Sequence, residues 1–249
     1  MMDFFLANLA NENLCWEEVM VDPLGGSGYK TRMVHITGDK FCEPSSASPV
    51  GPILMVHDLY WNVARWFKYF DDGVTKIPER LFNMGYDIWM ADMRGTLPSQ
   101  EHTTSDLINS EPETYWDFLL EDMGEEDIPA MLKKVLDSTT SSCKKVNILT
   151  AGYSSAIVAS ALDAFPSSTN NWVSQALMLE PIFVTGDRYS SALYGEDPTV
   201  SNPCLWVNSG RLLSQEKYRS LTRRLGAFIT KDCRATWDSA EYSAYLDYV

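Results

Sequence analysis

The sequence is poor in the residue groupings that identify several protein classes. Basic residues number 20 against 34 acidic ones, which gives a formal net charge of −14. Phosphate backbones repel such a chain, so nucleic acid is excluded as a partner. No apolar run approaches the ~20 residues that a membrane-spanning helix needs. The five cysteines form no CxxC pair and no metal-ligand spacing, so we expect no metal site and at most one or two disulfides.

The N-terminal segment also lacks the features of an export signal. Residues 1–14 contain an apolar patch without a positive region, and Asp3 stands where a signal peptide carries Lys or Arg. The chain contains no N-x-S/T glycosylation sequon. In the form given, the sequence therefore predicts no entry into the secretory pathway, and it assigns no compartment.

The composition is that of a globular protein, with 45% hydrophobic and 22% charged residues. Residues 16–23 and 29–36 predict an antiparallel hairpin around a Gly-rich turn. Strands buried on both faces are predicted by short apolar runs at 51–56, 86–92, 145–151 and 174–180. Apolar residues at helical spacing over 128–136, and the apolar stretch 155–165, predict intervening helices. This alternation indicates a three-layer α/β sheet.

The character of the chain changes after about Gly186. Residues 187–249 are polar and aromatic, with helical stretches at 216–229 and 239–248 and no further short apolar strand. We therefore expect a core over residues 1–186 and a helical appendage over residues 187–249.

One strand-to-helix junction carries the pattern of a nucleophile elbow. The predicted strand 145–151 runs into Gly152-Tyr153-Ser154-Ser155-Ala156 and then into the predicted helix. In such an elbow the turn lifts a serine hydroxyl out of the sheet, and the following N–H faces a developing oxyanion. We expect Ser154 to be the nucleophile and Ser155 N–H an oxyanion donor, with Gly152, Tyr153 and Ala156 supporting the turn. The alternative is a chance G-x-S-x-small string.

Further motifs follow one another at residues 17–19, 56–59, 84–95, 115–130 and 152–156. In the acid lipase family of α/β-hydrolases, similar segments read EEY-V, HGL, GYDVW followed by RGN, FW-F followed by DLPA, and GHSQG. The chain resembles this family over roughly residues 12–200. The family is the gastric and lysosomal type that cleaves triacylglycerols and steryl esters.

The resemblance implies an α/β-hydrolase sheet with about six of its eight strands present. Residues 187–249 would then begin a helical cap over the substrate site. It implies Ser154 as nucleophile, with the N–H groups of Leu59 and Ser155 forming the oxyanion hole. The expected ligand is a lipid ester or fatty-acyl group, with no cofactor and no metal. Three tryptophans either line the acyl pocket or pack in the core: Trp61, Trp66 and Trp206.

The sequence departs from the family in the residues that would complete a catalytic triad. In this fold the order along the chain is Ser, then Asp, then His, whereas His35, His57 and His102 all precede Ser154. Loss of a triad member leaves only about 10³–10⁴-fold acceleration over water. Three hypotheses follow: an impaired serine esterase, an inactive lipid-binding member, or an assembly subunit that pairs through an open sheet edge.

Asp58 is a second departure, because it replaces the glycine of the family's HGL turn. Its carboxylate would oppose an oxyanion at the N–H of Leu59. Alternatively, the side chain turns outward and caps the next helix.

Acidic residues at 121–127 suggest a solvated helix start with Asp127 as N-cap. The segment Asp92-Met93-Arg94-Gly95 predicts a structural ion pair and a turn.

Overall fold

The computed structural model describes residues 14–39, 41–45, 49–58, 62–68, 76–96, 99–165, 171–179 and 181. Four expectations fall outside these residues: the cap at 187–249, the oxyanion donor Leu59, and the tryptophans Trp61 and Trp206. Two compact units are distinguished, one formed by Met1–Thr103 with Glu121–Pro181 and the other by Thr104–Leu120 with Ile182–Val249.

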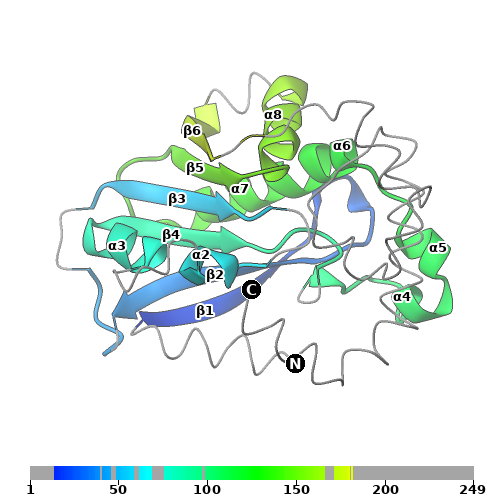
Figure 1. Ribbon diagram of the computed structural model, residues 1–249, viewed down its shortest axis with the longest axis horizontal. Coiled ribbons are helices and arrows are strands. Elements are labelled where there is room, and N and C mark those ends of the chain that lie inside the picture. The colour runs from blue at the N-terminus through cyan, green and yellow to red at the C-terminus, as the bar shows by residue number, and fades with distance from the viewer. Residues whose placement is uncertain are drawn as a thin grey trace, which may run out of the picture. The chain divides into compact units, whose positions relative to one another are not determined.

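The described part of the first unit is built on a six-stranded sheet with the order β1-β2-β4-β3-β5-β6 (Figure 1). The strands are β1 (Leu14–Val21), β2 (Thr31–Asp39), β3 (Gly51–Val56), β4 (Tyr86–Ala91), β5 (Val146–Ala151) and β6 (Val173–Leu179). β1, β2 and β4 pair antiparallel, whereas β4, β3, β5 and β6 run parallel. All six predicted strands are confirmed, and the strand order is that of an α/β-hydrolase sheet.

Helices connect the parallel strands, because parallel neighbours need a crossover. They are α2 (Arg65–Lys68), α3 (Ile77–Asn83), α6 (Leu120–Asp122), η3 (Met123–Asp127), α7 (Ile128–Ser138) and α8 (Ser154–Ala164). The helices predicted over 128–136 and 155–165 are confirmed as α7 and α8. In the second unit, the described residues form α4 (Leu107–Ser110) and α5 (Pro112–Tyr115).

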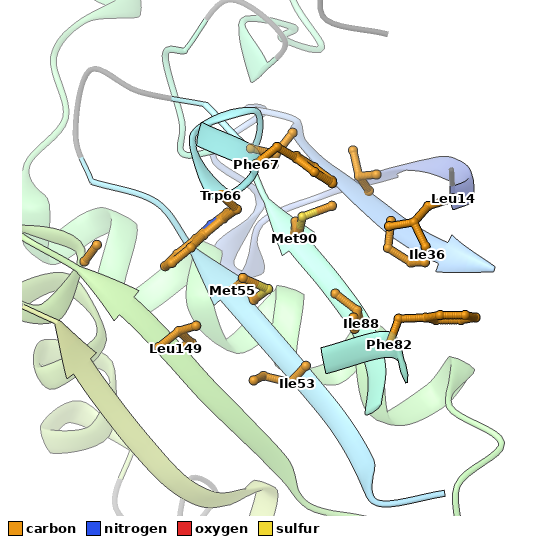
Figure 2. Close-up of a cluster of buried hydrophobic side chains, with 13 residues drawn as sticks. Leu14, Ile36, Ile53, Met55, Trp66, Phe67, Phe82, Ile88, Met90 and Leu149 are labelled. Atoms are coloured by element: carbon orange, nitrogen blue, oxygen red, sulfur yellow. The ribbon is translucent and has the colours of Figure 1, made fainter. Parts of the chain in front are cut away.

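Both faces of the central strands are buried, as a parallel sheet between helix layers requires. On one face, Trp66 of α2 and Phe82 of α3 pack in a cluster with residues such as Met55 and Met90 (Figure 2). The alternate residues Leu54 and Trp89 point to the opposite face and are buried there as well. Of the two interpretations of Trp66, lining an acyl pocket or packing in the core, the structure shows packing in the core.

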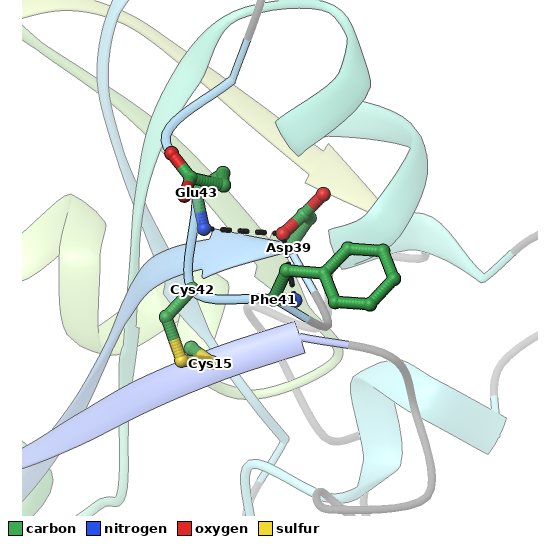
Figure 3. Close-up of a disulfide and its surroundings, with 5 residues drawn as sticks. All are labelled: Cys15, Asp39, Phe41, Cys42 and Glu43. Atoms are coloured by element: carbon green, nitrogen blue, oxygen red, sulfur yellow. Dashed lines mark hydrogen bonds between the residues drawn. A yellow bond between two sulfur atoms is a disulfide. The ribbon is translucent and has the colours of Figure 1, made fainter.

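A disulfide joins Cys15 at the start of β1 to Cys42 in the loop after β2 (Figure 3). The loop is tied down by Asp39, whose Oδ1 accepts the N–H groups of Phe41 at 2.8 Å and Glu43 at 3.1 Å. An added Cβ at Gly38 would lie 2.5 Å from the Cys42 carbonyl carbon, so only glycine admits this close approach. The cysteine count left this bridge open, and the hairpin register brings its two ends together.

β6 is the last strand of the described sheet and pairs with β5 on one side. Its side chains are less buried than those of β3, and Leu177 is 60% exposed. No other described strand lies beyond it. The predicted protein partner at an open sheet edge stays a prediction.

Candidate active site at the strand-to-helix turn

The turn between β5 and α8 is tight and is made at Gly152. The N–H of Gly152 still donates to Leu179 O of β6 at 2.9 Å, so sheet pairing continues through this residue. Its φ of 61° lies in the left-handed region that favours glycine. Tyr153, with φ −72° and ψ −24°, is already helical. The strand therefore turns into the helix at a single residue, as an elbow requires.

Ser154 is fully buried, with 0% of its surface exposed. Its Oγ lies 2.9 Å from Val56 O and 2.9 Å from Ala151 O, and it accepts the N–H of Ala151 at 3.1 Å. A hydroxyl carries one proton, so it donates to one of these two carbonyls. The predicted nucleophile is thus held among backbone groups at the ends of β3 and β5.

The groups predicted to support Ser154 belong to the start of α8. Ser155 N–H donates to Gly152 O at 3.3 Å, and Ser155 Oγ lies 2.7 Å from Thr150 Oγ1. Ala156 N–H donates to Tyr153 O at 2.9 Å. The N–H of Ser155, expected as an oxyanion donor, is therefore engaged within the first turn of the helix.

Asp58 reaches across from the end of β3 to the elbow. Its Oδ1 accepts the N–H of Tyr153 at 2.7 Å, where the dipole of α8 also favours a negative charge. Of the two interpretations of this residue, the outward-facing one is wrong: the carboxylate points at the elbow. Its partner N–H belongs to Tyr153, the residue that immediately precedes α8.

His57 is buried beside Asp58, and both ring nitrogens are engaged. Nδ1 lies 2.5 Å from Asp58 O, and Nε2 accepts the N–H of Met93 at 3.1 Å. This pair of contacts assigns the proton to Nδ1. The ring therefore fastens the end of β3 to the segment after β4 and is not placed to act as a base.

The other two histidines bond to groups outside the elbow. His35, on β2 as expected, lies between Glu17 at 3.0 Å and Asp87 at 2.8 Å. His102 Nε2 lies 3.1 Å from Ser27 O. In the described part of the chain, neither ring has Ser154 among its hydrogen-bond partners.

The charged residues of the segment 92–95 form buried ion pairs as predicted, but with partners outside the segment. Asp92 Oδ2 accepts from Arg32 Nε at 2.7 Å, while its Oδ1 accepts Val63 N–H at 2.9 Å. Burial raises the pKa of Asp92, but the neighbouring His57 ring, 3.5 Å from its Oδ1, and the charge of Arg32 outweigh it and leave the pKa below its ordinary value. The carboxylate is ionised and structural.

Arg94 forms a second buried ion pair, with Asp127 at 2.6 Å and Glu126 at 2.6 Å. It also lies 4.2 Å from the centre of the Tyr29 ring. The expectation that Asp127 caps α7 is wrong, because its carboxylate turns inward to Arg94 and makes no cap bond. Burial raises the pKa of Asp127 to about 6, against the opposing attraction of Arg94.

The residues before α7 differ from the solvated helix start that was expected. Met123–Asp127 form a short π-helix, η3, in which Met123, Gly124 and Asp127 are buried.

Among the described residues, no group of three or more His, Cys, Asp or Glu side chains is placed to hold a metal ion. Within the same residues, no helix has the length and apolar content needed to cross a membrane.

Sequence relatives of the chain are lipases, although no protein-family profile matches it. A probable lipase of Schizosaccharomyces pombe is 27% identical over 161 residues, 64% of this chain and 33% of the relative. Lipase member N of Homo sapiens is 28% identical over 94 residues, 38% of this chain and 22% of the relative. Lipase lipl-1 of Caenorhabditis elegans is 30% identical over 101 residues, 39% of this chain and 22% of the relative.

A solved structure similar in fold is a hyperthermophilic esterase from Pyrobaculum calidifontis. It aligns with a TM-score of 0.46 at 13% identity, over 89% of this chain and 67% of the esterase. The matched sequence relatives are much longer than the aligned part, which spans between 22% and 33% of their lengths. The sheet order, the tight elbow and the lipase relatives agree with the five motifs, and the chain is similar to lipases of the acid lipase type.

Proposed function

We propose that this chain is a lipase-like protein that binds a lipid ester or fatty-acyl group without hydrolysing it at Ser154. The observation that carries the proposal is the burial of Ser154, whose Oγ is surrounded by backbone partners. A nucleophile must bring its oxygen to within about 3–3.5 Å of the reacting carbon. A hydroxyl with no exposed surface does not meet this condition.

The electrostatics of the turn support the same proposal. Ester hydrolysis places a negative charge on the carbonyl oxygen, which preorganised N–H donors must stabilise. Here the N–H of Tyr153 already faces the carboxylate of Asp58 at 2.7 Å. A second negative charge beside this carboxylate would be repelled, which opposes the transition state of acyl transfer.

The ligand class is proposed from the similarity of the chain to lipases. Relatives bear the name lipase, and lipases act on lipid esters. We also propose that residues 1–186 form the hydrolase core and residues 187–249 the start of a cap that covers the ligand. A non-catalytic role needs no cofactor, and the proposal includes none.

The second candidate is ester hydrolysis through Ser154, which the similarity to lipases favours. It requires two changes at the described turn: Asp58 must leave the N–H of Tyr153, and Ser154 Oγ must exchange its backbone partners for the substrate. Both candidates bind the same ligand class, so binding alone does not separate them.

Labelling with a fluorophosphonate probe separates the two candidates. The purified full chain and its Ser154→Ala variant are treated with the probe, and the adduct is located by mass spectrometry. The proposal expects no adduct at Ser154, and equal, saturable uptake of a fluorescent fatty acid by both proteins. An adduct at Ser154 that disappears in the variant would establish the hydrolase instead. Absence of saturable uptake would remove the proposed ligand class.

A further inference from the structure

We infer that Gly152, not Ser154, occupies the apex of the elbow, and that Asp58 closes this position from within. The inference deepens the proposed function and rests on it, because it identifies where a catalytic side chain would have to stand in this chain. It assigns three roles: Gly152 as the vacated apex, Tyr153 N–H as the anion donor, and Asp58 as the internal anion.

The backbone places the apex at Gly152. An elbow residue sits on a strained turn between a strand and a helix. Gly152 is the residue with φ of 61°, and its N–H is the last to pair with β6 through Leu179 O. Its carbonyl oxygen accepts the N–H of Ser155 at 3.3 Å, within the first helical turn. One residue thus belongs to the strand on one side and to the helix on the other.

Ser154 is the first residue of α8 and lies two positions past this turn. Its neighbours Tyr153 and Ser155 are buried as well, and the Ser154 hydroxyl points back to Val56 O and Ala151 O. A small residue two positions after the apex is what the elbow pattern requires for close packing of helix on sheet. Ser154 meets that requirement, which explains its burial without a catalytic role.

The N–H that follows the apex is the oxyanion donor of an elbow. Counted from Gly152, this donor is the N–H of Tyr153, and it holds an anionic oxygen, Asp58 Oδ1, at 2.7 Å. An internal carboxylate therefore stands where the oxygen of a bound ester or carboxylic acid would be stabilised. The N–H donor, that of Tyr153, is thus present, and the Asp58 carboxylate occupies it.

The same carboxylate fills the space of a side chain at the apex. An ideal Cβ built on Gly152 would lie 2.6 Å from Asp58 Oδ1, and the nearest contacts, to Oδ2 and Cγ, are closer still. Real Cβ atoms essentially never approach other atoms so closely. Any residue other than glycine at position 152 therefore requires Asp58 to move or to be shortened, so the two positions are coupled.

Thiol accessibility tests the assignment without requiring catalysis. The background carries Cys143→Ser, Cys204→Ser, Cys233→Ser and Asp58→Gly, which leaves the Cys15–Cys42 disulfide in place. Gly152→Cys and Ser154→Cys are then introduced separately. Each folded protein is treated with N-ethylmaleimide, and the adduct is followed by intact mass. A chain that keeps Cys143, which is exposed, provides the reference rate.

The thiol at position 152 is expected to react at least about tenfold faster than the thiol at 154, which is reached only through local opening. Equal rates, or faster reaction at 154, would overturn the assignment. If the Gly152→Cys chain does not fold, amide hydrogen exchange in Asp58→Gly alone decides. The Tyr153 amide should exchange faster than in the unsubstituted chain while those of Ser155 and Ala156 keep their protection, and an unchanged Tyr153 rate would refute the role of Asp58.

These outcomes are independent of the probe experiment above. A fluorophosphonate adduct at Ser154 would refute the non-catalytic function directly. A protected thiol at position 152 would refute only the placement of the apex, and would leave the lack of hydrolysis to be explained by the buried Ser154 hydroxyl alone.

Discussion

The imidazole of His35 lies flat on the indole of Trp89, with ring centroids 3.9 Å apart and planes 8° apart. The ring is held in this position by Glu17 on one nitrogen and Asp87 on the other. Burial lowers the pKa of His35, but the two carboxylates outweigh this effect and raise the pKa above its ordinary value of 6.5. In its protonated form, the His35 ring is therefore a cation held between two carboxylates.

This arrangement predicts a pH dependence of stability. Because the folded-state pKa of His35 is raised, its contribution is fully present below pH 6.5 and is lost as pH rises through the folded-state value. We expect His35→Gln to be most destabilising near pH 6 and progressively less so above it. Urea unfolding of both proteins across this range measures the difference. A difference in unfolding free energy that does not change with pH would contradict the prediction.

The buried Arg94–Asp127 pair is expected to matter more than an exposed pair of the same chain. Asp127→Asn leaves the Arg94 cation buried with an incomplete set of partners, which typically costs about 3–5 kcal/mol. The matched control is Lys133→Ala, which breaks the i,i+4 pair with Asp137, whose side chains are 58% and 62% exposed. Its cost should be about 0.5 kcal/mol or less. Chemical denaturation compares the two, and similar costs would show that the buried pair is dispensable.

Alanine substitutions at two glycines with positive φ should distinguish the cost of backbone strain from the cost of a steric clash. Gly26 has φ of 73° and open space around its missing Cβ, whereas Gly152 has φ of 61° and faces Asp58. Gly26→Ala should cost about 1–2 kcal/mol, the cost of the left-handed region alone. Gly152→Ala should cost about 1–3 kcal/mol more because of overpacking.

The excess should disappear when Asp58→Gly is combined with Gly152→Ala. Thermal unfolding of the four glycine and aspartate combinations at these two positions measures the coupling. If the two substitutions are additive, the carboxylate does not occupy the space at Gly152.

The Cys15–Cys42 disulfide is expected to stabilise the hairpin edge of the sheet. Opening a bridge that spans 27 residues removes a restraint on the unfolded chain worth about 2–4 kcal/mol. We expect Cys15→Ser combined with Cys42→Ser to lower the melting temperature, while Cys143→Ser, which removes an exposed free thiol, does not. A thermal shift assay with and without reductant checks both expectations. Equal melting temperatures in all chains would contradict a stabilising bridge.

The sequence predicts the framework of this fold more reliably than the contacts at its turns. The central strands could be located because burial on both faces gives them short, continuous apolar runs in the sequence. The helix α7 could be located because its apolar residues repeat at helical spacing. The elbow motif could be located because a glycine and small residues stand between a predicted strand and a predicted helix. The continuation of sheet pairing through Gly152 to Leu179 could not be located, because it depends on β6, a separate segment of the chain.

The errors concern acidic side chains whose partners lie far away in the chain. Asp127 caps nothing because Arg94, 33 residues earlier, offers a stronger partner. Asp58 binds Tyr153, 95 residues later. Local capping preferences describe what an aspartate does when no such partner is near. The sequence alone could not identify Arg94 and Tyr153 as partners, because only the folded chain brings them next to Asp127 and Asp58.

The bridge between Cys15 and Cys42 makes the hairpin and its turn a closed covalent loop. A protease that cuts the exposed turn at Leu24–Gly26 would therefore not release a fragment, because the two cut ends stay joined through sulfur. On a non-reducing gel the nicked chain would migrate as a single species, and reductant would separate it into two. The first strand of the sheet is in this way secured against loss even after its peptide connection to the rest of the molecule is broken.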